Sequence, residues 1–120
     1  MPQFLTISSG TELLRIPSEI LMYITAEGNY SEVFVKDGKS RLVSYQLGQM
    51  EDLIGNQLGE DESPFIRIGK SLIVNRDFIF LIDVSDQELT IADWNGNYYK
   101  LKASRKALSE LKLILENTTI

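Results

Sequence analysis

Apolar and polar residues alternate in short runs along most of the chain, which is the pattern of half-buried β-strands. Asp37-Gly38 and Asn95-Gly96 separate neighbouring runs and are typical of type I′ hairpin turns. A polar loop is expected over Ala26–Ser31. Because the runs are joined by short turns rather than by crossover helices, they predict antiparallel sheets. The predicted strands are Phe4–Ser8, Glu12–Ile16, Ile20–Thr25, Glu32–Lys36, Ser40–Ser44, Phe65–Ile68, Ser71–Val74, Phe78–Val84, Glu88–Ala92 and Tyr98–Ala103.

Two segments have helical spacing instead. Apolar residues recur every three or four positions within Gln46–Leu58, and again within Arg105–Glu116, where Ser104 is a candidate N-cap. We therefore expect a mainly β chain with two short accessory helices and at least twice as many residues in strands as in helices. At 120 residues, the chain (1–120) fits a single domain.

The amino-acid composition excludes several kinds of catalytic and metal-binding site. The chain has neither Cys nor His, which removes thiolate sites, the commonest general base and the commonest metal ligand. Its carboxylates show no spacing that would organise an acid–base pair or a metal site. We expect no enzymatic activity, no metal and no cofactor. No apolar run approaches a membrane span and the first ten residues lack signal-peptide features, so we expect a cytoplasmic location without membrane insertion.

The charge distribution is uneven. The net charge is −5, which opposes nucleic-acid binding because phosphate contacts supply most non-specific affinity. The placement of the charges along the chain is nevertheless compatible with a basic face on one side of the protein. Glu51, Asp52, Glu60, Asp61 and Glu62 gather in the middle of the chain. The basic residues that we expect to cluster away from them are Lys70, Lys100, Lys102, Arg105 and Lys106.

One run is specific to a family. Phe65–Asn75, together with Ser104-Arg105, resembles the signature F-x-R-x-H-x-S-x-x-V-N … S-R of LytTR DNA-binding domains, the output modules of many bacterial response regulators. The resemblance extends from about Leu13 to Leu115. It implies an elongated arrangement of small antiparallel sheets with short helices.

The resemblance also implies a site. LytTR domains place loops, not a recognition helix, into successive major grooves of double-stranded DNA. The corresponding contact residues in this sequence are Asn29, Tyr30, Ser31, Gly69, Lys70, Ser71, Ser104 and Arg105, with Lys102 as a phosphate contact. Gly69 stands where the family commonly has His, which leaves only a backbone N–H donor there. Arg67 is expected to be structural, and Asn75 to bond local backbone.

Partners follow from the same resemblance. We expect sequence-specific binding to double-stranded DNA in transcription regulation, with a second copy on repeated half-sites by analogy with the family. The alternative is an acidic protein-interaction module of the same fold that engages a regulator or sensor protein. Carboxylates paired directly with Lys70 and Arg105 would favour that module. Whether the chain stands alone or is a piece of a longer regulator stays open.

Overall fold

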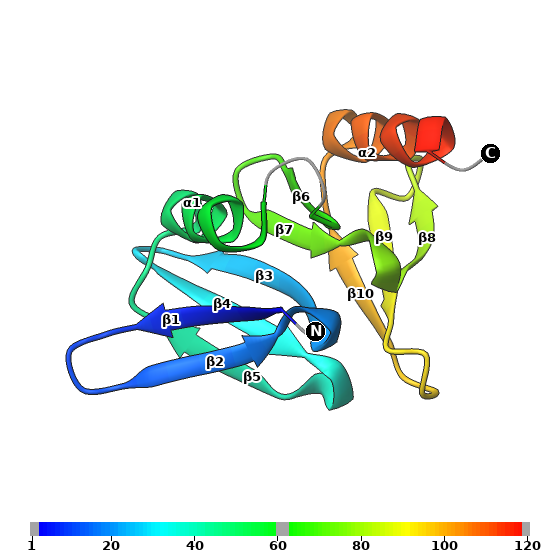
Figure 1. The fold of residues 1–120 in the computed structure, drawn as a ribbon. Coiled ribbons are helices and arrows are strands. Elements are labelled where there is room, and N and C mark those ends of the chain that lie inside the picture. The colour runs from blue at the N-terminus through cyan, green and yellow to red at the C-terminus, as the bar shows by residue number, and fades with distance from the viewer. Residues whose placement is uncertain (1–2, 60–62, 119–120) are drawn as a thin grey trace.

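The computed structural model describes residues 3–59 and 63–118. In this part of the chain, strands form three antiparallel sheets, against which two α-helices pack (Figure 1). The strand orders are β1-β2, β5-β4-β3-β7-β6 and β10-β9-β8. The elements are β1 (Phe4–Ser8), β2 (Leu13–Pro17), β3 (Leu21–Glu27), β4 (Tyr30–Val35), β5 (Ser40–Val43), α1 (Leu47–Leu58), β6 (Phe65–Ile68), β7 (Leu72–Asn75), β8 (Ile79–Asp83), β9 (Glu88–Ala92), β10 (Tyr98–Lys102) and α2 (Arg105–Thr118).

The predicted mainly β, antiparallel architecture is confirmed. All strand pairs are antiparallel, and the molecule is moderately elongated, with extents of 43 × 33 × 28 Å. The hairpin signal at Asp37-Gly38 also holds, since both residues have the left-handed φ of 78° that a type I′ turn requires. The type I′ prediction for Asn95-Gly96 is wrong: β9 and β10 do form a hairpin, but the left-handed residues in its longer turn are Trp94 and Gly96, not Asn95. Both helices lie where the apolar spacing predicted them.

Several boundaries differ from the prediction. The expected loop Ala26–Ser31 is mostly strand, because β3 and β4 continue to a two-residue turn at Gly28-Asn29, where Gly28 has φ 63°. Short 3₁₀ turns not expected from the sequence occur at Ser18–Ile20 and Arg76–Phe78. Among the described residues, strands hold slightly less than twice as many residues as α-helices, because α2 continues to Thr118. The expected twofold excess is therefore narrowly missed.

Two apolar cores share the five-stranded sheet. In β3, Leu21 and Ile24 belong to the core beneath α1 and the β1–β2 hairpin, whereas Met22 and Tyr23 belong to the core beneath α2 and the β8–β10 sheet. Four consecutive residues of β3 are consequently buried, as in strands covered on both faces. Leu108 of α2 is completely buried in the second core, so this core holds α2 against the sheets.

A buried carboxylate organises the turn between β9 and β10. Asp93 is fully buried and accepts hydrogen bonds from the Asn97 side-chain amide at 2.8 Å and from the backbone N–H groups of Asn95 and Asn97 at 2.8 and 3.1 Å. These bonds, first of all that from the Asn97 side chain, hold the pKa of Asp93 below its usual 3.8 even though burial acts in the opposite direction.

We expect this carboxylate to make stability depend on pH. The folded pKa is depressed, so the stabilisation is present above the unfolded pKa and is lost as pH falls through the folded value. Asp93→Asn should therefore be less stable than the parent near neutral pH, and the gap should narrow below about pH 4. Urea unfolding of both proteins at several pH values measures this gap. A gap that does not change with pH would contradict the assignment.

Candidate nucleic-acid interface

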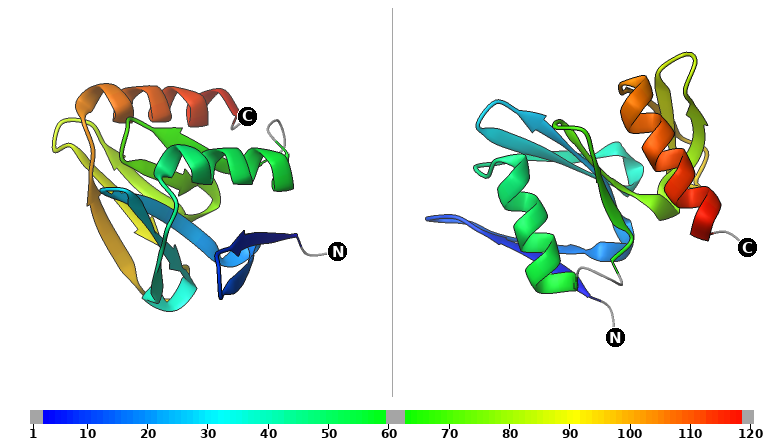
Figure 2. Two further views of the ribbon diagram at one scale, coloured as in Figure 1. Left: turned by 90° about the vertical axis from the view of Figure 1, so that its left-hand side faces the viewer. Right: turned by 90° about the horizontal axis from the view of Figure 1, so that it is seen from above.

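Three turns and the start of α2 gather along one edge of the molecule, which we call the turn edge. It consists of the β3–β4 turn, the β6–β7 turn, the β8–β9 turn and the first turn of α2, and both views in Figure 2 place these segments together. Hydrogen bonds link several of them. The N–H of Ala26 donates to the carbonyl of Ser71 at 2.9 Å, and the N–H of Ala103 donates to the carbonyl of Gln87 at 3.2 Å. A Cβ on Gly69 would lie 3.9 Å from that of Ala107.

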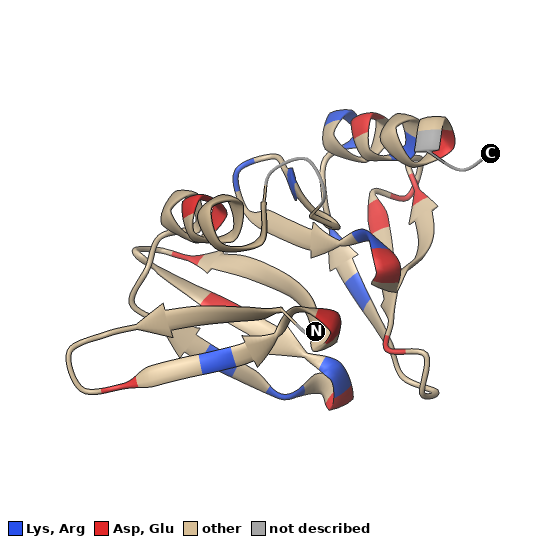
Figure 3. Ribbon diagram, in the orientation of Figure 1, with Lys and Arg blue, Asp and Glu red and all other residues tan. Residues whose placement is uncertain are grey.

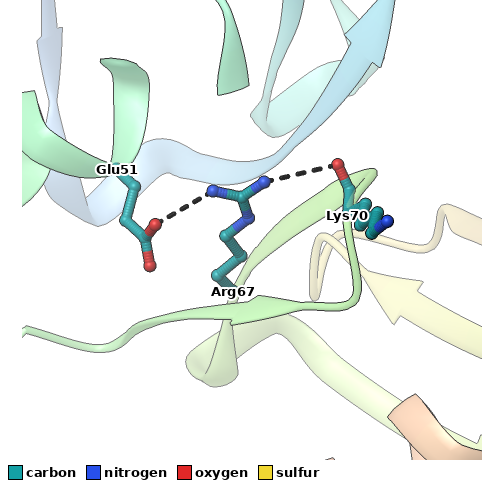
Figure 4. A network of polar contacts seen from close by, with 3 residues as sticks. All are labelled: Glu51, Arg67 and Lys70. Carbon is teal, nitrogen blue, oxygen red and sulfur yellow. Dashed lines mark hydrogen bonds and ion pairs between the residues drawn. The ribbon is translucent and has the colours of Figure 1, made fainter. Parts of the chain in front are cut away.

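The β6–β7 turn presents Lys70 to solvent. Arg67 on β6 lies beneath it: one guanidinium nitrogen donates to the carbonyl of Lys70 at 3.5 Å, and the other pairs with Glu51 of α1 at 3.0 Å (Figure 4). The side chain of Lys70 points away from Arg67 and is exposed. Arg67 therefore has the structural role expected for it, which is to tie the turn to α1.

Gly69 gives this turn its shape. Its φ of 61° is in the left-handed region, which L-residues adopt at a cost of roughly 1–2 kcal/mol. The only neighbour within 4 Å of an added Cβ among the described residues is Ala107, at the ordinary contact distance of 3.9 Å. A side chain at position 69 would thus be limited by backbone strain rather than by a clash.

We expect Gly69→Ala to lower the free energy of unfolding by about 1–2 kcal/mol through this strain. Gly10→Ala is the matched control, because Gly10 lacks a left-handed φ and an added Cβ meets no described atom within 4 Å. The control should change stability by no more than about 0.5 kcal/mol. Urea unfolding measures both, and equal effects would show that Gly69 is not a conformational requirement.

The start of α2 carries the second cationic group. Ser104 is the N-cap that the sequence predicted, because its Oγ accepts from the N–H of Ala107 at 3.1 Å. Arg105 is exposed, and one of its terminal nitrogens donates to the carbonyl of Ser85 in the β8–β9 turn at 3.3 Å. A guanidinium has five N–H donors, so this bond steadies Arg105 while leaving donors for a ligand. The sequence did not predict this contact between Arg105 and the β8–β9 turn, because the polar residues of a turn do not indicate which other element the turn contacts.

The β3–β4 region departs most from the expected loop. Asn29 lies in the turn and is exposed, and its Oδ1 accepts from the Gln46 side chain at 3.3 Å. Tyr30 is on β4, with 47% of its surface exposed. Ser31 is completely buried on β4, and its hydroxyl donates to the carbonyl of Tyr45 at 2.7 Å. Because Ser31 has no exposed surface and its hydroxyl is used within the fold, it is not available to contact DNA.

The remaining predicted contacts are exposed. Ser71 is exposed in the β6–β7 turn, and Lys102 is exposed at the end of β10, beside the segment that leads into α2. Asn75, in contrast, is buried. Its Oδ1 accepts from the backbone N–H of Asp77 at 2.9 Å, which confirms the expected bond to local backbone, and its side-chain amide also donates to the carbonyl of Leu21 at 2.9 Å.

The cationic side chains of the turn edge form no ion pairs with carboxylates of the described residues. Figure 3 shows basic positions on the β6–β7 turn, on β10 and at the start of α2. None of Lys70, Lys102, Arg105 and Lys106 forms an ion pair within residues 3–59 and 63–118. The observed ion pairs join Arg41 to Glu12, Arg67 to Glu51, Lys100 to Glu88 and Lys112 to Glu116. The carboxylate pairing that would favour an interaction module is thus absent from the described residues, and Glu60, Asp61 and Glu62 lie outside them.

Other kinds of site receive no support in the described part of the chain. It contains no group of three or more Asp or Glu side chains arranged to hold a metal ion. None of its helices combines the length and apolar character that crossing a membrane requires.

Comparisons with known proteins identify the family and support the fold. The family model of the LytTr DNA-binding domain matches residues 11–116. Among solved structures, the fold is similar to the LytTr DNA-binding domain of a protein described as a methyl-accepting/DNA response regulator from Bacillus cereus. That similarity has a TM-score of 0.64 at 22% sequence identity and covers 96% of this chain and 98% of the other. No curated protein sequence matches the chain. Because the family model spans most of its length, the chain belongs to the LytTR family of DNA-binding domains.

Proposed function

We propose that this domain binds double-stranded DNA sequence-specifically through its turn edge and acts as the output domain of a cytoplasmic bacterial transcription regulator. The observation that carries the proposal is the meeting of the β3–β4 turn, the β6–β7 turn and the α2 start on one edge. The contact set is Asn29, Tyr30, Gly69, Lys70, Ser71, Lys102, Ser104 and Arg105.

The chemistry of this edge suits the major groove. Long cationic side chains donate to the O6 and N7 acceptors of guanine, and hydroxyl or amide groups bond either bases or phosphates. Lys70 and Arg105 extend from separate segments that meet at Gly69 and Ala107, so both can approach one duplex. Ser104 caps α2 by accepting from Ala107, which positions Arg105, and its hydroxyl hydrogen can still donate to a phosphate.

Local charge explains how an acidic protein binds DNA. Near the β6–β7 turn, the charge of Glu51 is balanced by its ion pair with Arg67. The cations of the turn edge form no ion pair within the described residues, although the net charge of the chain is −5. Two carboxylates of the β8–β9 region, Asp83 and Asp86, lie near this edge, and Asp83 accepts from the N–H of Asp86 at 2.9 Å. We expect them to weaken non-specific binding and so to sharpen dependence on base contacts.

A genomic-fragment selection with the purified protein tests the proposal, followed by fluorescence-anisotropy titration of the most enriched fragment, the selected site. The parent should bind the selected site much more tightly than a scrambled duplex. The variant Lys70→Ala/Arg105→Ala should lose this preference. Lys39→Ala is the control, since Lys39 is exposed but lies beyond the opposite end of β4 from Asn29. Absence of enrichment, or equal loss in the control, would reject the turn edge as the DNA surface.

A further inference from the structure

A group of large apolar side chains is exposed on the β8–β10 sheet, mostly toward the end of the strands that is opposite the β8–β9 turn. Phe80, Leu81, Trp94 and Tyr98 are exposed by 53%, 49%, 57% and 57% of their surfaces, and we call them the aromatic patch. The sheet pairing explains the exposure. Tyr99 and Leu101 of β10 pack toward the α2 core, so Tyr98 lies on the outer face. A register irregularity between Ile79 and Leu81 leaves both Phe80 and Leu81 exposed.

The patch is held rigid. Phe80 packs edge-on against Tyr98 with ring centroids 5.0 Å apart and against Trp94 at 6.3 Å. The indole N–H of Trp94 donates to the carbonyl of Asp77 at 2.7 Å. Trp94 also has a left-handed φ of 59°, which is strained for a bulky residue, and the turn that follows the buried Asp93 keeps it there. A preorganised ring loses little conformational freedom on binding, which is the condition under which Trp and Tyr dominate interfaces.

The charges around the patch balance locally. Register places four charged residues on the same outer face, along the strands toward the turn edge. They are Asp83, Glu88, Lys100 and Lys102. Lys100 and Glu88 already approach each other at 3.8 Å. This face is therefore close to neutral within a chain of net charge −5. A neutral face carrying both signs can meet a copy of itself without repulsion, whereas a nucleic-acid strand needs a net positive surface.

We propose that the aromatic patch is the surface through which two copies of this chain contact each other. In a two-fold arrangement the rings of one copy pack on those of the other, and Lys100 of each copy faces the region of Glu88 in its partner. The β9–β10 turn and the start of α2 lie at opposite ends of this sheet (Figure 1). A two-fold axis along the strands therefore keeps the patch central and directs both turn edges to the same side.

The small area of the patch predicts weak association between two free copies of the chain. A free aromatic side chain has roughly 150–250 Å² of surface, so the three half-exposed aromatic side chains and the smaller Leu81 together offer on the order of 400 Å² per copy. Twice this area is below the roughly 1,200–2,000 Å² of a stable complex. The contact is thus weak between free copies, with a Kd between about 10 µM and 1 mM, and becomes effective when DNA holds two copies side by side at millimolar effective concentration. That last step rests on the proposed DNA binding, but the contact between free copies does not.

Trp94 provides the probe, because it is the only tryptophan of the chain. Sedimentation equilibrium of the free protein, without DNA, should show the mean mass rising toward a dimer up to about 1 mM, and the Trp94 emission should shift to shorter wavelength over the same range as the indole loses water. Tyr98→Ser should weaken association by at least about tenfold. Leu42→Ser, at a residue of β5 with a similar exposure of 54%, should leave it unchanged. Circular dichroism and urea unfolding confirm that both variants fold.

Several results would overturn this inference. A monomeric mass throughout the range, equal effects of the two variants, or a rising mass without an emission shift would each remove the patch from the contact. Quenching of Trp94 by a single-stranded oligodeoxythymidine, without any rise in mass, would identify the patch instead as a stacking surface for unpaired bases. These measurements are made without duplex DNA. A result that rejects the contact between copies therefore says nothing against the proposed DNA binding, and the two proposals are tested separately.

Discussion

Leu108→Ala is expected to lower the free energy of unfolding by about 2–5 kcal/mol. Leu108 has no exposed surface and lies in the core that joins α2 to the β8–β10 sheet and the central sheet. Truncation removes its buried methyl groups and leaves a cavity that the surrounding strands fill only in part. The same loss loosens α2, the element that carries Arg105 to the turn edge.

Leu113→Ala is the matched control for this prediction. Leu113 lies within the same helix and is 58% exposed, so the substitution changes helix propensity equally but removes little buried area. It should change the free energy of unfolding by no more than about 0.5 kcal/mol. Urea unfolding of the three proteins gives both differences. Similar losses for Leu108→Ala and Leu113→Ala would show that α2 is not held by the second core.

The sequence predicted the architecture well where a local rule has one structural solution. Period-two alternation and the Asp37-Gly38 signal specify hairpins, because only a few residue pairs adopt two consecutive left-handed conformations. Apolar spacing located both helices for a similar reason. The prediction of a loop over Ala26–Ser31 was wrong. Polar residues at the exposed ends of two strands have the same composition as a loop, and only the pairing of β3 with β4 distinguishes the two cases.

The site was less predictable because it depends on contacts distant in sequence. Ser31 has the composition of a DNA contact, but its burial and its bond to Tyr45 depend on how β4 meets the segment before α1. The Arg105 contact with Ser85 joins residues twenty positions apart and has no sequence signature. The exposure of Phe80 arises from an irregular register, whereas its sequence context resembles any buried strand.

Arg105→Ala and Lys102→Ala should affect DNA binding in different ways. A base-contacting Arg105 forms hydrogen bonds that only the right sequence offers, so its truncation should cost on the order of 1–3 kcal/mol on the selected site and relax preference at one base position. Lys102, at the end of β10, is expected to contact phosphate, which every duplex presents. Its truncation should weaken all duplexes alike and reduce the salt dependence by about one charge.

Titration of both variants against the selected site and a scrambled duplex, at several salt concentrations, separates these roles. The two variants are well matched. Arg105 and Lys102 are both exposed, and neither forms an ion pair within the described residues. Replacement of either residue by Ala removes one positive charge. Any difference in sequence preference between the two variants therefore reports on base contacts rather than on net charge. Equal losses on both duplexes for Arg105→Ala would exclude base contact by Arg105 and reduce its role to that of a phosphate contact.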